Sequence, residues 1–373
     1  MLNRRLVRIR VMQALYAFEK AKAANFLLAN DLIAESFAPD LNSMEKQDKN
    51  KLQGLQKLTQ SIFQDEIKSK IFSDDSGLPS SVKLAMANAR ELYKLKNKKD
   101  LEFFSLQIIL DAEKVYDLYI YLLALLIEIA QKFEAPSAMT KNKVILALKS
   151  SKDLEYQMLK RSINWENERV FVARIYNETL KNNPHIQEYL EKVNHSAEED
   201  VAILKYIIKN IFLKKEECAE FFEKMHIYWV EDTDILRTML FHSIQGYTDT
   251  EKIEIEKLDE LWEDTKDFMK TLFRTTVDQD EQLQAYLVPF LKNWEIDRII
   301  ETDRVLLKMA VSELINFPSV PVKVTINEII DISKSYSSAK SGNFVNGILD
   351  SVVKELQAKK ILKKSGRGMI DNK

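Results

Sequence analysis

The chain is poor in glycine and proline, with seven of each in 373 residues. Both residue types punctuate strands and their turns, so their scarcity argues against a β-sheet protein and predicts an all-α fold. A single cysteine, Cys218, excludes an internal disulfide framework and is typical of a reducing compartment. We expect this cysteine to be a small buried side chain.

Long apolar runs are also missing. The most apolar stretch, Leu118–Ile127, lies between Asp117 and Glu128, and it is only half of the roughly 20 residues that a bilayer-spanning helix needs. Because it is apolar on all sides, it predicts a core helix. The N-terminus has no apolar segment of the signal-peptide type. We therefore expect a cytoplasmic protein with no membrane partner.

Motifs for catalysis, cofactors and metals are absent as well. The sequence has no H-E-x-x-H, P-loop or G-x-G-x-x-G pattern, and its four histidines do not have metal-ligand spacing. These histidines are His185, His195, His226 and His242. The sequence thus predicts a protein that is not an enzyme and that needs no cofactor or metal.

A basic cluster is present at the start of the first predicted helix, which runs from about Arg5 to Lys22. Four arginines fall within seven residues, and the first acid is Glu19; the arginines are Arg4, Arg5, Arg8 and Arg10. A helix N-terminus carries about half a positive charge, so each cation there is unfavourable by some tenths of a kcal/mol. Helix stability therefore does not explain why the arginines lie at this position.

Helical spacing assigns the faces of this segment. The core stripe comprises Val7, Val11, Ala14, Leu15 and Phe18. Arg5 and Tyr16 share an outward flank, and Arg8 lies at its border. A cation beside an aromatic ring suits single-stranded RNA, which is bound by phosphate contacts and base stacking. The alternative is a solvated basic face, or arginines that pair with acids from another segment.

The C-terminal region has the clearest helical pattern. Thr325 and Glu328 form a T-x-x-E capping box, which predicts a helix start at Thr325. In the stretch AKSGNFVNGILD, Ser341 is the expected N-cap of the next helix. Gly342 and Gly347 lie inside that helix, although glycine is unfavourable there by roughly 0.5–1 kcal/mol relative to alanine.

Two roles for these glycines stay open. In one, Gly342 leaves the first-turn amides uncovered beside Lys340, and the Phe344 ring lies nearby, an arrangement that suits a phosphate and its base. In the other, Gly347 permits close approach of two helices and Phe344 belongs to the core.

The segment VPVKVTINEIIDISKSYSSAKSGNFVNGILD resembles the signature of the NusB family of transcription antitermination proteins, and RRLVRIRVMQALYAFE is similar to that family's arginine-rich first helix. The resemblance covers residues 1–20 and 260–358. It implies a NusB-like helical bundle of two subdomains that carries a large helical insertion. The implied segments are a first helix at 1–22, the insertion at 23–255, a C-terminal core at 256–358 and a flexible basic tail at 359–373.

The resemblance also implies a function. Family members bind the boxA element of ribosomal RNA leader transcripts with NusE, a small-subunit ribosomal protein, in the RNA polymerase antitermination complex. They support transcription and maturation of ribosomal RNA and are not enzymes. The residues that match the RNA-side motifs are Arg4, Arg5, Arg8, Gln13, Tyr16, Asn343 and Phe344. Lys340 joins them as the cation that precedes Gly342.

Two positions depart from the family pattern. Leu6 stands where relatives often have a basic or small residue, and Lys340 stands where an acid is common. The formal net charge of the whole chain is only −2, so no global field attracts nucleic acid. The alternative function is therefore a helical protein–protein adaptor, with weakened or lost RNA binding and the insertion as its working surface.

Overall fold

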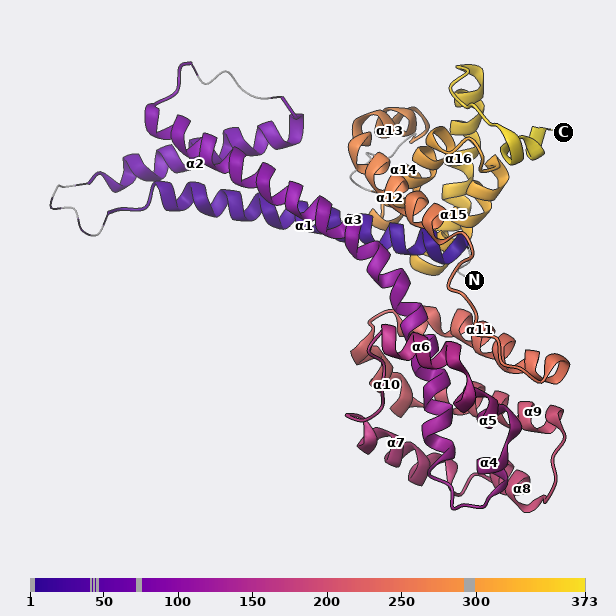
Figure 1. Ribbon diagram of the computed structural model, residues 1–373. Coiled ribbons are helices and arrows are strands. Elements are labelled where there is room, and N and C mark those ends of the chain that lie inside the picture. Colours follow the sequence, from indigo (N-terminus) through magenta and orange to yellow (C-terminus); the bar gives the residue numbers. More distant parts are fainter. Residues whose placement is uncertain are drawn as a thin grey trace. The chain divides into compact units, whose positions relative to one another are not determined.

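The computed structural model describes residues 4–40, 42, 44, 47–71, 76–291 and 299–372, and in these residues every regular element is a helix (Figure 1). The expected all-α fold is confirmed. The α-helices are α1 (Arg4–Ser36), α2 (Lys49–Ser69), α3 (Ser80–Ala130), α4 (Ala138–Lys141), α5 (Lys143–Ser150), α6 (Lys152–Lys160), α7 (Arg169–Ile175), α8 (Pro184–Glu191), α9 (Ala197–Ile207), α10 (Glu216–Met225), α11 (Trp229–Thr250), α12 (Trp262–Asp278), α13 (Asp280–Leu287), α14 (Glu301–Asn316), α15 (Val322–Tyr336) and α16 (Ser341–Ala358). Two π-helical turns, η1 (Tyr176–Leu180) and η2 (Ile208–Phe212), and two 3₁₀ turns, η3 (Val288–Phe290) and η5 (Gly366–Asn372), complete them.

The chain forms two compact units. One consists of Met1–Val7 and Ile109–Lys266, and the other consists of Arg8–Ile108 and Asp267–Lys373. The insertion expected at 23–255 is thus shared between the units: its first part belongs with the C-terminal helices. No helix in the described residues is long and apolar enough to span a membrane.

The first helix is longer than the sequence predicts, because α1 continues from Lys22 to Ser36. The expected core stripe from Val7 to Phe18 is confirmed as buried. Beyond it, Ala29 and Ile33 are fully buried against Phe63 of α2 and Met86 of α3. Burial of this second apolar face stabilises the extension, and the segment has no glycine or proline to end the helix.

The apolar run Leu118–Ile127 lies in α3 and is buried along most of its length, as expected of a core helix. In its unit, the other helices pack around this part of α3 (Figure 1). Cys218 is fully buried, which confirms the prediction, and desolvation raises the pKa of its thiol to about 12.

Three C-terminal helices, α14, α15 and α16, pack against one another. The capping box expected at Thr325 is wrong: α15 begins three residues earlier, at Val322, with Pro321 as its N-cap. Thr325 is instead buried inside the helix, where its hydroxyl donates to Glu313 Oε1 at 2.7 Å. A tertiary hydrogen bond has taken the side chain that the local pattern assigned to a cap.

The basic tail is packed against the connection between α14 and α15. Lys364 Nζ donates to the carbonyl of Phe317 at 3.0 Å, and the Ser365 amide donates to the carbonyl of Pro318 at 3.0 Å. A Cβ added at Gly368 would lie 2.1 Å from the Pro318 carbonyl oxygen. Part of the basic tail, from Lys364 to Gly368, thus contacts this connection, and the flexibility expected of residues 359–373 stays a prediction.

Candidate functional site

Arg8 is an interior residue. Its Nε donates to Glu313 Oε2 at 2.8 Å and its NH2 group donates to Oε1 at 2.5 Å, and the two side chains are 1% and 0% exposed. The guanidinium also lies 5.3 Å from the centre of the Phe268 ring. The expectation that Arg8 lies at the border of an outward flank is wrong. For this arginine the alternative holds, since it pairs with an acid from another segment.

Arg10 is also buried, with 2% exposure. Its NH1 group donates to Gln13 Oε1 at 2.9 Å, one turn further along α1. Gln13 is half-buried, and this bond fixes its amide oxygen. Gln13 therefore orients Arg10 within the protein, and only the rest of its amide is available to a ligand.

The other candidates on α1 reach the surface. Arg4 is exposed and Arg5 is half-buried, and both belong to the unit that contains Ile109–Lys266. Tyr16, in the other unit, is 36% exposed. The Lys20 ammonium lies 5.0 Å from the centre of the Tyr16 ring and also pairs with Glu301. Arg4, Arg5 and Tyr16 thus keep the accessibility that a role in RNA contact requires.

The start of α16 differs by one residue from the expected start. Lys340 occupies the N-cap position without a side-chain cap, and Ser341 is the first helical residue. The Ser341 hydroxyl donates to Asp303 Oδ2 at 2.7 Å and accepts from the Ser338 amide at 3.2 Å. Ser341 therefore ties the start of α16 to α14 instead of capping its own helix.

Neither role expected of the two glycines survives as stated. Gly342 is buried beneath Lys334 of α15, whose Cγ would lie 2.9 Å from a Cβ at this position, so its amide is covered. Gly347 is exposed, with nothing within 4 Å of such a Cβ, so it serves no close helix approach. The close approach that glycine permits occurs at Gly342, between its backbone and a lysine side chain.

A cavity of about 220 Å³ lies beside the start of α16. Its lining residues are Ile299, Ile300, Asp303, Ser338, Lys340, Ser341 and Phe344. The Lys340 side chain is exposed, the Phe344 ring is half-buried, and Asn343 is exposed next to them. The structure thus brings two predicted residues, Lys340 and Phe344, together at one small cavity, whereas Asn343 does not line it.

Asp303 is the functional candidate that the sequence did not indicate. Its side chain is 3% exposed, and its Oδ1 has no hydrogen-bond partner in the described part of the chain. A buried carboxylate oxygen without a partner is unfavourable, so this atom is a candidate acceptor for a donor from a ligand. In the sequence, Asp303 is one acid among many, and only the fold places it beside Phe344. The cavity therefore combines an acceptor, a cation and an aromatic face.

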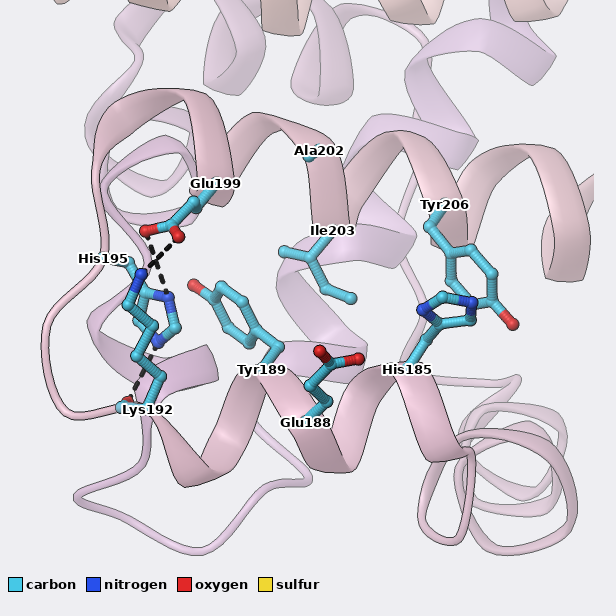
Figure 2. Close-up of a pocket in the computed structure, with 9 residues that line it drawn as sticks. All are labelled: His185, Glu188, Tyr189, Lys192, His195, Glu199, Ala202, Ile203 and Tyr206. Atoms are coloured by element: carbon cyan, nitrogen blue, oxygen red, sulfur yellow. Dashed lines mark hydrogen bonds and ion pairs between the residues drawn. The ribbon is translucent and has the colours of Figure 1, made fainter.

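A second pocket, of about 430 Å³, lies between α8 and α9 in the other unit (Figure 2). The ring of His195 stacks on the ring of Tyr189, with centroids 3.9 Å apart. The ring centroids of His185 and Tyr206 are 4.6 Å apart. Burial raises the pKa of Tyr189, whose hydroxyl donates to Asp200 Oδ1 at 2.6 Å.

Charged groups complete this second pocket. Lys192 pairs with Glu199, and His195 Nδ1 lies 3.9 Å from Glu199 Oε2. The lining contains no serine, threonine or cysteine. The described residues also contain no group of three or more side chains placed to hold a metal ion. This pocket offers ring surfaces and opposite charges for contact, but no alcohol or thiol of serine, threonine or cysteine.

Comparisons with known proteins separate the C-terminal part of the chain from the rest. The model of the NusB family matches residues 234–354, which include the cavity beside α16 but not α1. The resemblance of the C-terminal signature is therefore confirmed, whereas residues 1–20 lie outside the match. No solved structure is significantly similar to the chain.

Similar curated proteins carry the name transcription antitermination protein NusB. The protein from Salinibacter ruber is 44% identical over 106 residues, which are 28% of this chain and 66% of the relative. The one from Chloroherpeton thalassium is 39% identical over 28% of this chain, and the match spans only 50% of the relative. The one from an Exiguobacterium species is 36% identical over 107 residues, or 84% of the relative. The chain belongs to the NusB family.

Proposed function

We propose that this protein is an RNA-binding transcription antitermination factor that acts on boxA-type sequences of ribosomal RNA leader transcripts. The observation that carries the proposal is the cavity beside α16. It gathers the Lys340 cation, the unpartnered Asp303 Oδ1 and the Phe344 ring inside the segment that matches the NusB family. The names of the relatives support the antitermination role.

Each group at the cavity has a distinct role in this proposal. A base stacks on Phe344, because aromatic rings hold single-stranded bases by their faces. An amino group on the edge of that base donates to Asp303 Oδ1, and Lys340 neutralises the adjoining phosphate. Asn343 supplies an exposed amide for a further hydrogen bond. In the other unit, Arg4 and Arg5 contact phosphates further along the transcript.

We further propose that the protein acts in the cytoplasm with NusE, within the RNA polymerase antitermination complex, and that it catalyses no reaction itself. The segment from Glu251 to Asp303 contains 15 acidic and 7 basic residues, a difference of −8. An acidic segment of this kind is complementary to a basic ribosomal protein, which supports the choice of partner.

One observation favours the alternative, a protein–protein adaptor. Burial of Arg8 and Arg10 removes two of the four clustered arginines from the surface. With Leu6 at a position that is often basic in relatives, the amount of accessible positive charge on α1 is small. An adaptor would bind partner proteins, NusE among them, through the insertion, and its binding of boxA RNA would be weakened or lost.

A binding experiment separates the two functions. The affinity of the full chain is measured for boxA RNA and for a scrambled RNA of the same composition, each with and without NusE. The proposed function predicts tighter binding to boxA RNA than to the scrambled RNA, enhanced by NusE. The adaptor predicts binding of NusE with equal, weak affinity for the two RNAs, and that result would reject the proposal.

A further inference from the structure

The positive charge of this chain is concentrated outside the segment that matches the NusB family. Residues 49–100, which contain α2 and the first part of α3, have eleven lysine or arginine residues and six acids, a difference of +5. The whole chain has a formal net charge of −2. A local excess of this size creates a field that attracts polyanions, whatever the charge of the whole chain.

The densest part of this basic region lies on α3. Lys94, Lys96, Lys98 and Lys99 are all exposed, and in the described part of the chain no carboxylate lies within 4.0 Å of their ammonium groups. Lys94 and Lys98 are i,i+4 neighbours, so their like charges repel and destabilise the helix slightly. Helix stability alone therefore does not explain why these four positions are all lysine.

The exposed surface of the helix is wide at this point, although Tyr93 and Asn97 on one side contact α2 and α1. From Arg90 to Phe104, no residue of α3 is buried. At about 100° per residue, Lys94 and Lys98 lie on one face, while Lys96 and Lys99 lie toward the opposite side. A flexible polyanion such as single-stranded RNA can contact lysines on both sides of the helix, whereas a flat acidic face of a protein contacts only one side.

A cavity of about 780 Å³ adjoins these lysines between α1, α2 and α3. Arg90 is held at its wall by Glu66, with Nε–Oε2 and NH2–Oε1 distances of 2.8 and 2.5 Å. The half-buried Tyr93 is fixed edge-on against Phe63, with centroids 6.1 Å apart. Lys94 lies at the same cavity. The cavity therefore places a fixed aromatic ring beside one of the four lysines, Lys94.

We propose that Lys94, Lys96, Lys98 and Lys99, together with the cavity at Tyr93, form a second RNA-binding surface that holds the sugar–phosphate backbone without reading its sequence. The ammonium groups neutralise phosphates, and Tyr93 provides a stacking face for any base. The choice of RNA as the polyanion rests on the function proposed above. This surface lies outside the boxA contact, so the two sites extend the length of transcript that is bound.

The test uses the full chain and a short unstructured RNA that lacks boxA. Its affinity for wild type and for the K94Q/K96Q/K98Q/K99Q variant is measured by fluorescence anisotropy over a series of salt concentrations. Removing one lysine–phosphate pair lowers the slope of log K against log [salt] by about 0.7, so the four substitutions together lower it by about 3. Circular dichroism checks that the variant keeps its helices.

A matched variant controls for total charge. K132Q/K149Q/K152Q/K181Q removes four exposed lysines from the other unit and changes the net charge equally. It is expected to keep the wild-type salt slope. An equal decrease in both variants would show a general charge effect and overturn the proposal, as would an unchanged slope in the K94Q/K96Q/K98Q/K99Q variant.

Two further arms identify the polyanion and distinguish the lysine surface from the boxA site. In one arm, poly-glutamate and unlabelled RNA compete with the labelled RNA at equal concentrations of negative charge. Equal competition by the two would indicate an acidic protein partner and would overturn the choice of RNA. Phe344→Ala is expected to weaken the preference for boxA and to leave the salt slope on boxA-free RNA unchanged. A failure of the boxA site is thus distinguishable from a failure of the lysine surface.

Discussion

Arg8 and Glu313 form a bidentate ion pair in the interior, although 305 positions separate them in the sequence. Both side chains are at most 1% exposed, and Thr325 donates a third hydrogen bond to the same carboxylate. This pair joins the first helix to α14 and α15. It makes Arg8 part of the architecture that holds the C-terminal helices, so we do not expect Arg8 to contact RNA.

Glu313→Gln is expected to destabilise the fold strongly. It leaves the buried guanidinium of Arg8 without a compensating charge, a change that costs about 3–5 kcal/mol in other proteins. The free energy of unfolding is measured by urea denaturation. Glu301→Gln, which breaks the exposed pair with Lys20, serves as the control and is expected to change little. Equal, small effects of the two substitutions would contradict a structural role for Arg8.

The two glycines of α16 are expected to respond differently to alanine. Gly347→Ala adds a Cβ in open space and should raise the free energy of unfolding by about 0.5–1 kcal/mol. Gly342→Ala places its Cβ 2.9 Å from Lys334 Cγ. Displacement of the Lys334 side chain therefore offsets the increase in the free energy of unfolding. Urea denaturation of both variants tests this. Equal stabilisation by the two substitutions would show that Lys334 does not constrain Gly342.

The accessible arginines of α1 are expected to act by neutralising phosphates. The double substitution Arg4→Gln and Arg5→Gln should lower the slope of log K against log [salt] for boxA RNA by about 0.7 for each arginine that pairs with a phosphate. It should weaken the binding of scrambled RNA to a similar degree. Anisotropy titrations at several salt concentrations measure both effects. A wild-type slope in the double variant would remove Arg4 and Arg5 from the RNA-binding surface.

Cys218 is expected to resist alkylation in the native protein. Burial raises the pKa of its thiol from the ordinary 9.0 to about 12, so the reactive thiolate is scarce near pH 9. Because the folded pKa lies above the unfolded one, its contribution to stability is complete below pH 9 and is lost as the pH rises toward 12. Iodoacetamide labelling followed by mass spectrometry, with and without urea, measures this. Rapid labelling of the native chain would contradict the burial of Cys218.

The sequence predicts what depends on local periodicity. The stripe from Val7 to Phe18 and the core run in α3 are buried as expected, because spacing alone decides which face of a helix is apolar. Family resemblance adds Asn343 and Phe344 of α16 as candidates for RNA contact, and that role stays a prediction. The prediction for Arg8 fails because its partner is remote in the chain, and a helical projection shows only which side of the helix a residue occupies.

The remaining errors have the same origin. The T-x-x-E pattern at Thr325 is present in the sequence, but it does not cap a helix, because the Thr325 hydroxyl donates to the Glu313 carboxylate instead. Likewise, Asp303 gains its role from the loop and helix that the fold brings beside it, and no spacing rule connects it with Phe344. The features that this sequence does not predict are therefore the buried polar groups whose partners are remote in the chain.

The affinity of Phe344→Ala for boxA RNA tests the account most directly. Tyr156→Ala, which removes a ring that is 59% exposed on α6 in the other unit, is the matched control. If a base stacks on Phe344, its loss weakens binding by about 1–3 kcal/mol, whereas the control keeps wild-type affinity. Wild-type affinity in a folded Phe344→Ala protein would contradict the assignment of the α16 cavity as an RNA site.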